Sequence, residues 1–242
     1  MDTRPVVRRG VPAGSEARVA ALYWEAFGRK LGAALNPPDK ARAFLAAHLH
    51  HDRGVTALVD GEVAGVAGYQ LDGRGLTGGG AGDVLAAYGV LRGLPRLALL
   101  TLLERRPAAH ELVMDGIAVA PEHRGAGIGA RLLSEIAAVA AEAGCHRIRL
   151  DVIDVNPRAG ALYERHGFTA VRTENTPYLR GLMGFGAVTT MHRPVTAADS
   201  GPRPAAGADP RPDSDPRPDS DPRTGAGLGS RHDGDGLGGE GR

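Results

Sequence analysis

Three glycines at alternate positions stand where a loop leads into a helix and could bind an anion. They are Gly125, Gly127 and Gly129, and the helical pattern that follows them runs to Ala143. Without side chains, successive backbone N–H groups can turn toward one negatively charged group, and the positive end of the helix dipole strengthens that contact. Arg124 adds a cationic side chain at the edge of the loop. The segment predicts a diphosphate site, or else a turn that needs glycine for its backbone alone.

Two other phosphate-binding loops compete with this interpretation. Gly125, Gly127 and Ala130 fit the dinucleotide fingerprint GxGxxG/A, and Asp151 lies on the next expected strand. In that fold, however, the first glycine ends the strand, whereas here five residues separate Val119 from Gly125. A P-loop requires Gly-Lys-Ser/Thr, which the sequence lacks. A dinucleotide-binding protein therefore stays as an alternative, and a P-loop does not.

The same loop resembles the pyrophosphate-binding loop of the GNAT (Gcn5-related) N-acetyltransferases. Residues 124–129 read RGAGIG and fit that family's Arg/Gln-x-x-Gly-x-Gly/Ala pattern. Residues 115–121, DGIAVAP, resemble the family's fourth strand, and residues 156–168, NPRAGALYERHGF, fit its Asn-x-x-Ala-x-x-x-Tyr-x-x-x-Gly-Phe segment. The three motifs come in the family's order and cover residues 111–173. Residues 73–106 and the C-terminal tail lie outside the usual pattern of the family.

The resemblance implies an acetyl-CoA-dependent N-acetyltransferase that modifies a primary amine by direct attack in a ternary complex. The implied fold is α/β, with a mixed central sheet of six to seven strands and helices on both faces. Acetyl-CoA would be the cosubstrate, and no metal is expected. Its pyrophosphate would lie on the glycine-rich loop and its pantetheine arm on the backbone of the preceding strand. The expected cofactor-binding residues are Ile117, Ala118, Val119, Arg124, Gly125, Ala126, Gly127, Ile128, Gly129, Ala130, Asn156 and Tyr163.

Acyl transfer from a thioester to an amine needs a neutral amine, a polarised carbonyl and a protonated leaving thiol. By the resemblance, Tyr163 occupies the general-acid position, where its phenol would protonate the departing thiolate. A backbone N–H within residues 117–119 would polarise the thioester carbonyl. A tyrosine that merely packs under the sheet is the simpler alternative. Asn156 would hydrogen-bond the pantetheine arm, cap the helix that begins near Pro157, or do both.

The general base is open between two carboxylates, Glu111 and Asp115. Their even spacing places them on the same face of an unbulged strand. Counted back from Arg124, Glu111 matches the catalytic glutamate of histone-acetylating relatives, while Asp115 lies beside the expected path of the acetyl group. Solvated edge carboxylates and a water-mediated route are the alternatives. Glu25, on the first expected helix, would face the acceptor pocket in the family's topology.

Hydrophobic periodicity predicts the elements that must position these residues. A helix is expected over residues 15–35, with Ser15 as its N-cap, and Asp39 would cap a second helix. Residues 55–59 and 63–70 are β-rich and flank an Asp-Gly dipeptide, which is typical of a type I′ hairpin. Farther along, strands are expected at residues 111–119, 147–153, 168–173 and 187–192, and helices at residues 127–143 and 158–166.

Residues 73–106 are expected to form an inserted helical arm. A glycine-rich stretch over residues 73–82 precedes a helical pattern that is broken at residues 93–95, Gly-Leu-Pro. The arm is too short and too interrupted to span a bilayer. It would serve as a substrate lid, as a dimer contact, or simply as part of the core.

Composition limits the number of domains and the partners. Residues 196–242 hold almost no large apolar side chains, so we expect one GNAT-like domain over residues 1–195 and a disordered tail rich in Pro, Gly, Asp and Arg. With 29 Lys and Arg against 28 Asp and Glu, nothing suggests nucleic acid or a membrane as partner. Cys145 is the only cysteine, so a disulfide within the chain is impossible. The N-terminus lacks the apolar run of a secretory signal, and a cytoplasmic location is expected.

A non-catalytic acyl-CoA-binding regulatory module is the alternative from a different functional class. The presence of both Tyr163 and Asn156 favours the enzyme over that module. The acceptor stays open among small metabolites, antibiotics, peptide N-termini and lysine. Its pocket would be lined by residues 15–52 and 73–106, the segments that carry no motif.

Overall fold

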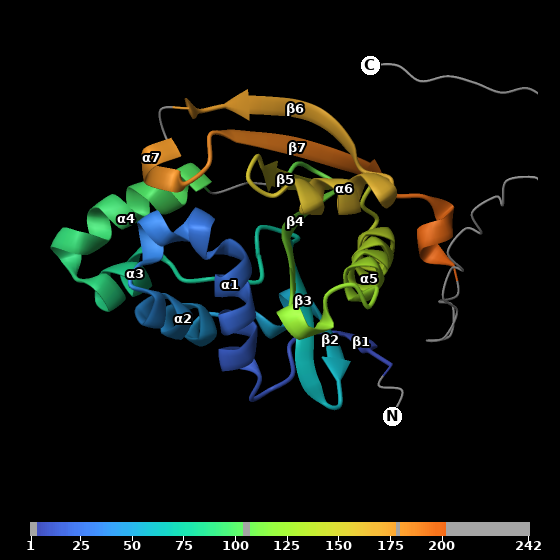
Figure 1. Cartoon of the computed structure of the whole chain (residues 1–242), viewed down its shortest axis with the longest axis horizontal. Coiled ribbons are helices and arrows are strands. Elements are labelled where there is room, and N and C mark those ends of the chain that lie inside the picture. The colour runs from blue at the N-terminus through green and yellow to red at the C-terminus, as the bar shows by residue number, and fades with distance from the viewer. Residues whose placement is uncertain (1–3, 104–106, 178–179, 202–242) are drawn as a thin grey trace, which may run out of the picture. The chain divides into compact units, whose positions relative to one another are not determined.

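A computed structural model describes residues 4–103, 107–177 and 180–201 of the chain, and most of the expected tail over residues 196–242 lies outside them. Within these ranges one seven-stranded sheet carries helices on both faces (Figure 1). The strands are β1 (Val6–Arg9), β2 (Gly54–Val59), β3 (Glu62–Gln70), β4 (Glu111–Val119), β5 (Arg147–Ile153), β6 (Thr169–Asn175) and β7 (Ala187–Pro194). The helices are α1 (Glu16–Leu35), α2 (Pro38–Ala47), α3 (Ala81–Tyr88), α4 (Val90–Leu103), α5 (Ile128–Glu142), α6 (Pro157–Arg165) and α7 (Arg180–Met183).

The strands follow the order β1-β2-β3-β4-β5-β7-β6. Neighbours run antiparallel except for β4 and β5, which are parallel. The mixed α/β sheet predicted from the sequence is thus confirmed. A sheet with one parallel pair is not the doubly wound parallel sheet that a dinucleotide-binding fold requires.

Apolar side chains from both faces of the sheet form two clusters. On one face, Leu132 and Ile136 of α5 pack with Leu112 of β4 and Ile148 of β5. On the other face, α1 packs against β3 and α2 packs on α1, and Val66 is buried in the same cluster. Because side chains alternate along a strand, the residues next to Leu112 on β4 face α1 rather than α5.

The hairpin of β2 and β3 forms where the sequence predicts it. Its turn residues Asp60 and Gly61 both have positive φ angles, 52° and 85°. A type I′ turn requires this conformation at both central positions, and glycine and aspartate tolerate it well.

β4 and β5 diverge soon after they begin. Their paired residues are Glu111 with Arg147, Leu112 with Ile148, and Val113 with Arg149, but β4 continues to Val119 along β3. The second half of β4 therefore has a hydrogen-bonded neighbour on one side only.

The direction of the hydrogen bonds shows which residues of β4 face this gap. Ala120 N donates to Ala64 O at 2.8 Å, and hydrogen-bonded pairs alternate along an antiparallel ladder. The main-chain groups of Ala118 therefore point toward β3, while those of Ile117 and Val119 point toward the gap.

A β-bulge interrupts β4 at Asp115. Gly68 pairs with Gly116 and Tyr69 with Met114, which leaves Asp115 as the extra residue. Because the bulge lies at Asp115 itself, the segment before it keeps the normal alternation. Glu111 and Asp115 therefore both lie on the face of the sheet that α1 covers.

The inserted arm consists of α3 and α4, but the break predicted at residues 93–95 is wrong. α4 runs through Pro95, and the chain turns instead at Gly89, whose φ is 77°. Only glycine adopts this conformation readily, whereas a proline in the second turn of a helix can be accommodated at the loss of a single hydrogen bond.

Among the described residues, no helix combines the length and apolar character needed to cross a membrane.

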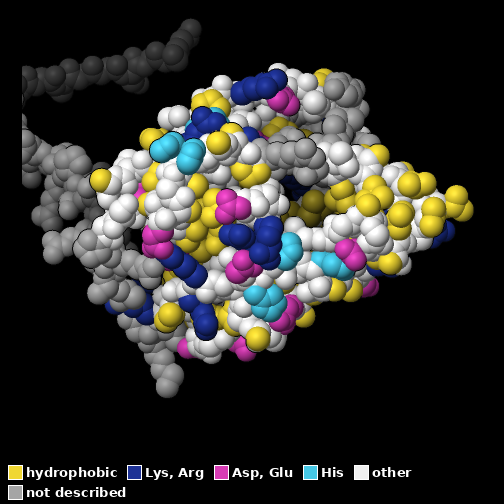
Figure 2. Space-filling model, turned by 180° about the vertical axis from the view of Figure 1, so that it is seen from behind, with side chains coloured by type: hydrophobic (Ala, Val, Ile, Leu, Met, Phe, Trp, Pro, Cys, Tyr) yellow, Lys and Arg dark blue, Asp and Glu magenta, His cyan; other side chains and the backbone are white. Residues whose placement is uncertain are grey.

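The arm packs on the core at one end and exposes apolar residues at the other. Leu97, Leu99 and Leu100 pack against the cluster around α1. Figure 2 shows hydrophobic side chains gathered toward the far end of the arm, where Leu91 is 91 % exposed. The packed end supports the expectation that the arm completes the core.

Two predicted helix caps also differ from the structure. Asp39 lies inside the first turn of α2, which begins at Pro38 after Pro37 as N-cap. Proline has the φ of a first helical residue built in, so the helix starts two residues earlier than an Asp39 cap would allow. Ser15 does precede α1, but its side chain makes no capping hydrogen bond.

We predict that Gly116→Ala lowers the free energy of unfolding by about 2–4 kcal/mol. Gly116 has a φ of 135°, and a Cβ built on it would lie 2.5 Å from the Phe27 ring. Gly160→Ala is the matched control, because a Cβ there meets nothing within 4 Å and alanine favours the helix. Urea denaturation measures both, and equal stability of the two variants would contradict the prediction.

Candidate active site

The glycine-rich loop presents backbone N–H groups at the start of α5. Gly125 and Gly127 have φ angles of 86° and 72°, and a Cβ on either would meet nothing within 4 Å. Gly127 is the N-cap residue, and Ile128 begins the helix. Among the described residues, no oxygen accepts a hydrogen bond from the amides of residues 125–130. The loop therefore has the open donors and the helix dipole that an anion requires.

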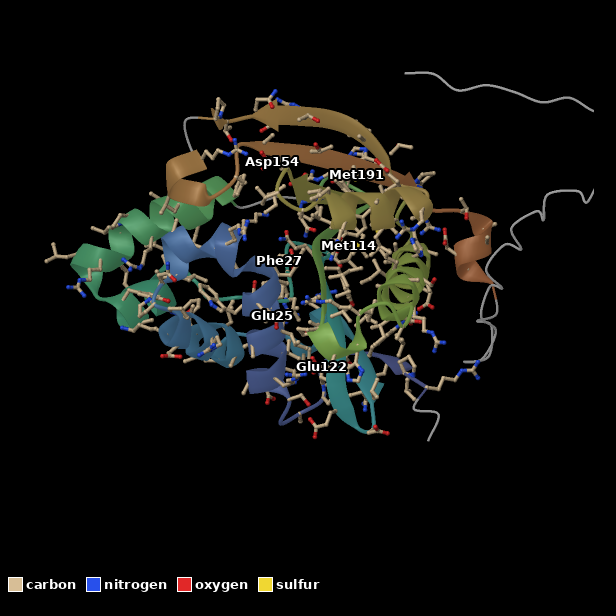
Figure 3. All side chains as sticks on the ribbon, in the orientation of Figure 1. Glu25, Phe27, Met114, Glu122, Asp154 and Met191 are labelled. Atoms are coloured by element: carbon tan, nitrogen blue, oxygen red, sulfur yellow. The ribbon has the colours of Figure 1, made fainter. Side chains whose placement is uncertain are left out.

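Arg124 connects this loop to α1. Its Nη2 donates to Glu25 Oε1 at 2.7 Å, and its Nε donates to the carbonyl of Val119 at 3.0 Å. Figure 3 shows Glu25 and Phe27 on α1, beside the strand that carries Met114. Glu25, expected near the acceptor pocket, thus pairs with the cation of the loop.

Tyr163 of α6 reaches the gap beside β4. Its side chain is buried, with 6 % exposed, and its ring packs on Phe168. Burial raises the pKa of its phenol to about 12, although a hydrogen bond from the backbone of Ile117 opposes that shift. The phenol therefore keeps its proton at neutral pH and lies next to a main-chain group that faces the gap.

Asn156 caps α6, as the sequence predicts. Its Oδ1 accepts a hydrogen bond from Ala159 N at 3.3 Å, and Pro157 occupies the first helical position. The cap uses the carbonyl oxygen of the side chain, so the amide NH₂ is the part that can donate to a ligand.

Asp115 is a buried carboxylate between α1 and the sheet. Gln70 Nε2 donates to its Oδ1 at 2.9 Å, and Leu76 N donates to its Oδ2 at 3.4 Å. Burial raises the pKa of Asp115, and those two hydrogen bonds and the charge of Lys30 only partly offset the shift. The charge of Asp115 in turn helps burial to raise the pKa of Tyr23. Asp115 therefore takes up a proton more readily than an aspartate in water does.

Glu111 lies in a different setting at the beginning of β4. Its side chain is 1 % exposed and accepts from Arg147 Nε at 2.7 Å and from Arg149 Nη1 at 3.3 Å. Burial opposes ionisation, but Ala108 N and the two arginines outweigh it, so the pKa of Glu111 is lowered. Such a carboxylate is a poor proton acceptor.

The two candidate proton-transfer groups approach β4 from opposite faces of the sheet. Tyr163 belongs to the cluster on the α5 side, and Asp115 contacts groups on the α1 side. Between them lie main-chain groups of Ile117 and Val119 that have no strand partner on the β5 side. An acyl group bound along this gap would have an acid on one side and a base on the other.

Neither Gln70 nor Arg149 follows from a motif, although both contact the predicted residues. Gln70 ends a strand that lies far from Asp115 in the sequence, and only the pairing of β3 with β4 brings them together. Arg149 likewise reaches Glu111 only because β5 pairs with β4. The alternation of Arg147, Arg149 and Asp151 with buried residues was the available signal.

Within the described ranges, no three His, Cys, Asp or Glu side chains gather as a metal would need.

The sequence matches the family model described as the acetyltransferase (GNAT) family over residues 17–168. The chain belongs to the GNAT family. GNAT proteins of known structure also share its fold. A GCN5-related N-acetyltransferase from Kribbella flavida aligns with a TM-score of 0.52 at 19% identity, over 79% of this chain and 98% of that one. Ard1 from Thermoplasma volcanium aligns with a TM-score of 0.51 at 15% identity, over 80% and 99% of the two chains.

Curated GNAT relatives match over a shorter segment. Thialysine N-epsilon-acetyltransferase from Bos taurus is 43% identical over 56 residues, which are 23% of this chain and 33% of that protein. The Sus scrofa protein of the same name is 41% identical over the same share. The aligned segment thus spans about a third of the length of these relatives.

We predict that Asp115→Asn becomes more stable relative to the wild type as the pH rises from acid to neutral. The raised pKa means that the folded protein keeps a proton that the unfolded chain releases, so ionisation of Asp115 weakens the fold as the pH rises through that range. An asparagine does not titrate and lacks this loss. Denaturation at a series of pH values measures the difference, with Asp60→Asn at the exposed hairpin turn as control. A variant that loses stability relative to the wild type as the pH rises would contradict the assignment.

Proposed function

We propose that this protein is an acetyl-CoA-dependent N-acetyltransferase that acetylates a primary amine by direct attack. One observation carries the proposal. A loop of open backbone donors at the start of α5 adjoins a strand whose main-chain groups face an unpaired gap. Pyrophosphate and the amides of a pantetheine arm have the chemistry that fits these two surfaces. Family membership supports the same conclusion.

The cosubstrate would be held mainly by backbone groups. The amides from Gly125 through Ala130, helped by Arg124, bind the pyrophosphate. Ile117 and Val119 hydrogen-bond the pantetheine arm, and the side-chain NH₂ of Asn156 adds a donor. The main-chain groups of Ala118 face β3 instead, so Ala118 holds Ile117 and Val119 in place and does not bind the arm itself. The bound thioester supplies the activated acetyl group.

Asp115 is the general base in this proposal. Its raised pKa brings the carboxyl group closer to the range in which it can accept a proton from an ammonium at neutral pH. Gln70 and Leu76 N hold the carboxylate in place. In this proposal Glu111 has a positioning role instead, which its ion pairs with two arginines support.

Tyr163 is the general acid. The amine nitrogen, deprotonated by Asp115, forms a bond to the thioester carbonyl carbon while a backbone N–H of the gap stabilises the developing oxyanion. The carbon–sulfur bond then breaks, and the phenol of Tyr163 gives its proton to the leaving thiolate. The products are an N-acetylated amine and the free thiol of CoA. The proton taken up by Asp115 returns to solvent and Tyr163 regains one.

The names of the curated relatives bear on the acceptor. They describe acetylation of the ε-nitrogen of thialysine, which supports an amine at the end of a chain as the acceptor of this protein as well. The acceptor would approach from the α1 side of the sheet, where Phe27 packs on Gly116 and Lys30 lies near Asp115.

We predict that the protein releases free thiol from acetyl-CoA in the presence of an amine and that Gly127→Glu abolishes CoA binding. A glutamate there places a negative side chain among the donors that bind the pyrophosphate. Gly127→Asn is the matched control, because asparagine tolerates the left-handed conformation and helix N-caps without adding charge. Calorimetric titration with CoA and a thiol assay over an amine panel measure both effects.

Two results would replace the proposal with one of its alternatives. Tight CoA binding without amine-dependent thiol release on any amine of the panel would identify a regulatory binding module. A rise in the melting temperature with NADH but not with CoA would favour a dinucleotide-binding protein.

We predict that Tyr163→Phe lowers kcat by about 10²- to 10⁴-fold with little change in the dissociation constant of CoA. The variant keeps the ring that packs on Phe168 and loses only the proton donor. Phe168→Leu perturbs the same packing without touching the phenol and serves as control. Equal losses of turnover and CoA affinity in the tyrosine variant would argue for a structural role.

A further inference from the structure

Arg149 has a binding edge without a partner. Its Nη1 donates to Glu111 Oε2 at 3.3 Å, while its Nε is buried and makes no hydrogen bond. Among the described residues, no oxygen accepts from the Nε–Nη2 edge of this guanidinium. That edge is the fork with which arginine binds a carboxylate through two parallel hydrogen bonds. A buried donor without an acceptor points to a ligand that supplies one.

The position of Arg149 places this fork in the acceptor half of the site. Arg149 and Val113 form the last pair before β4 and β5 diverge. Their neighbours Leu112 and Ile148 belong to the cluster under α5, so Arg149 projects from the opposite face, the face of Asp115. Asp115 follows Val113 by two residues, which is about 7 Å along a strand. The proposed base and the unpartnered fork therefore project from the same face of the sheet, from positions about two strand residues apart.

The charges around Arg149 favour an anion at the fork. Arg147 shares the carboxylate of Glu111 with Arg149, so these three side chains carry one net positive charge. His192 of β7, paired with Arg149 of β5, has a pKa lowered by burial and then by Arg147 and Arg149, against the opposing charges of Glu111 and Asp151. Within the described residues, the carboxylate that hydrogen-bonds Arg149 is thus already shared between two arginines.

The charge changes sign farther along the same face. Asp151 follows Arg149 by two residues on β5 and accepts a hydrogen bond from Thr190 Oγ1 at 2.7 Å. Asp151 and Asp115 occupy corresponding positions beyond the last pair, one on each diverging strand. A ligand lying along this face meets a cation first and carboxylates after it.

We propose that Arg149 binds a carboxylate of the acceptor, so that the substrate is a terminal primary amine separated from a carboxylate by several methylene groups. The carboxylate lies on the fork of Arg149, and the amine lies near Asp115. Glu111 is the positioning residue that orients the guanidinium through Nη1. This inference rests on the proposed acetyltransferase function and names the chemical class of its acceptor.

The test compares amines that differ only in the carboxylate. Lysine and 1,5-diaminopentane form one such pair, and 6-aminohexanoate and pentylamine form a second pair without an α-amine. Amine-dependent thiol release gives kcat/KM for each. We expect the carboxylate to raise kcat/KM about 10- to 100-fold in the wild type, as charge-assisted hydrogen bonds do.

Three variants locate the effect. Arg149→Met should abolish the preference, measured within each pair as the ratio of kcat/KM with the carboxylate to kcat/KM without it. Arg147→Met is the matched control, because it removes the other ion pair of Glu111 but should retain the preference. Arg149→Lys keeps the positive charge beside Glu111, so it provides a folded variant for the test if Arg149→Met unfolds. The lysine lacks the fork and should lose most of the preference.

The outcomes separate the two proposals. Equal kcat/KM within both pairs in the wild type would overturn the carboxylate site and leave the acetyltransferase intact. An equal loss of preference in the Arg147 and Arg149 methionine variants would also overturn it, because the effect would then act through Glu111. Thiol release with no amine at all would instead remove the proposed function.

Discussion

β4 and β5 stop pairing after Val113 and Arg149, although β4 continues to Val119. This loss of pairing is the constraint on which the site depends, because backbone donors and acceptors without partners inside a protein need a ligand or water. β3 keeps β4 extended by pairing with it up to Val119. The strand is thus held straight on one side and has no strand partner on the other.

Several separate features converge on that gap. The loop after β4 ends in glycines with positive φ, which open the backbone at the start of α5. The bulge at Asp115 turns a carboxylate toward α1, while Tyr163 approaches from α6. Burial shifts the pKa of both groups upward, which keeps a proton on the phenol and eases protonation of the carboxylate. Their opposite faces match the acid and base roles that acyl transfer needs.

Local signals in the sequence were sufficient for the frame of this site. The Asp-Gly turn, the alternation in β4 and the glycines before α5 each act within a few residues, so the hairpin, the strand and the loop were all predictable. The pairing of Asp115 with Gln70 and of Glu111 with two arginines was not, because it depends on the register between strands that are distant in the chain. The turn at Gly89 was missed because a proline in the following helix gave the stronger local signal.

β4 connects the two halves of the site within nine residues. Its end faces the proposed coenzyme surface, its bulge carries Asp115, and its beginning pairs with the strand of Arg149. An insertion or deletion anywhere in this strand would shift all three groups at once. We therefore expect new acceptor preferences in this scaffold to come from changes in surrounding parts such as α1 rather than from changes in the length of the central strand.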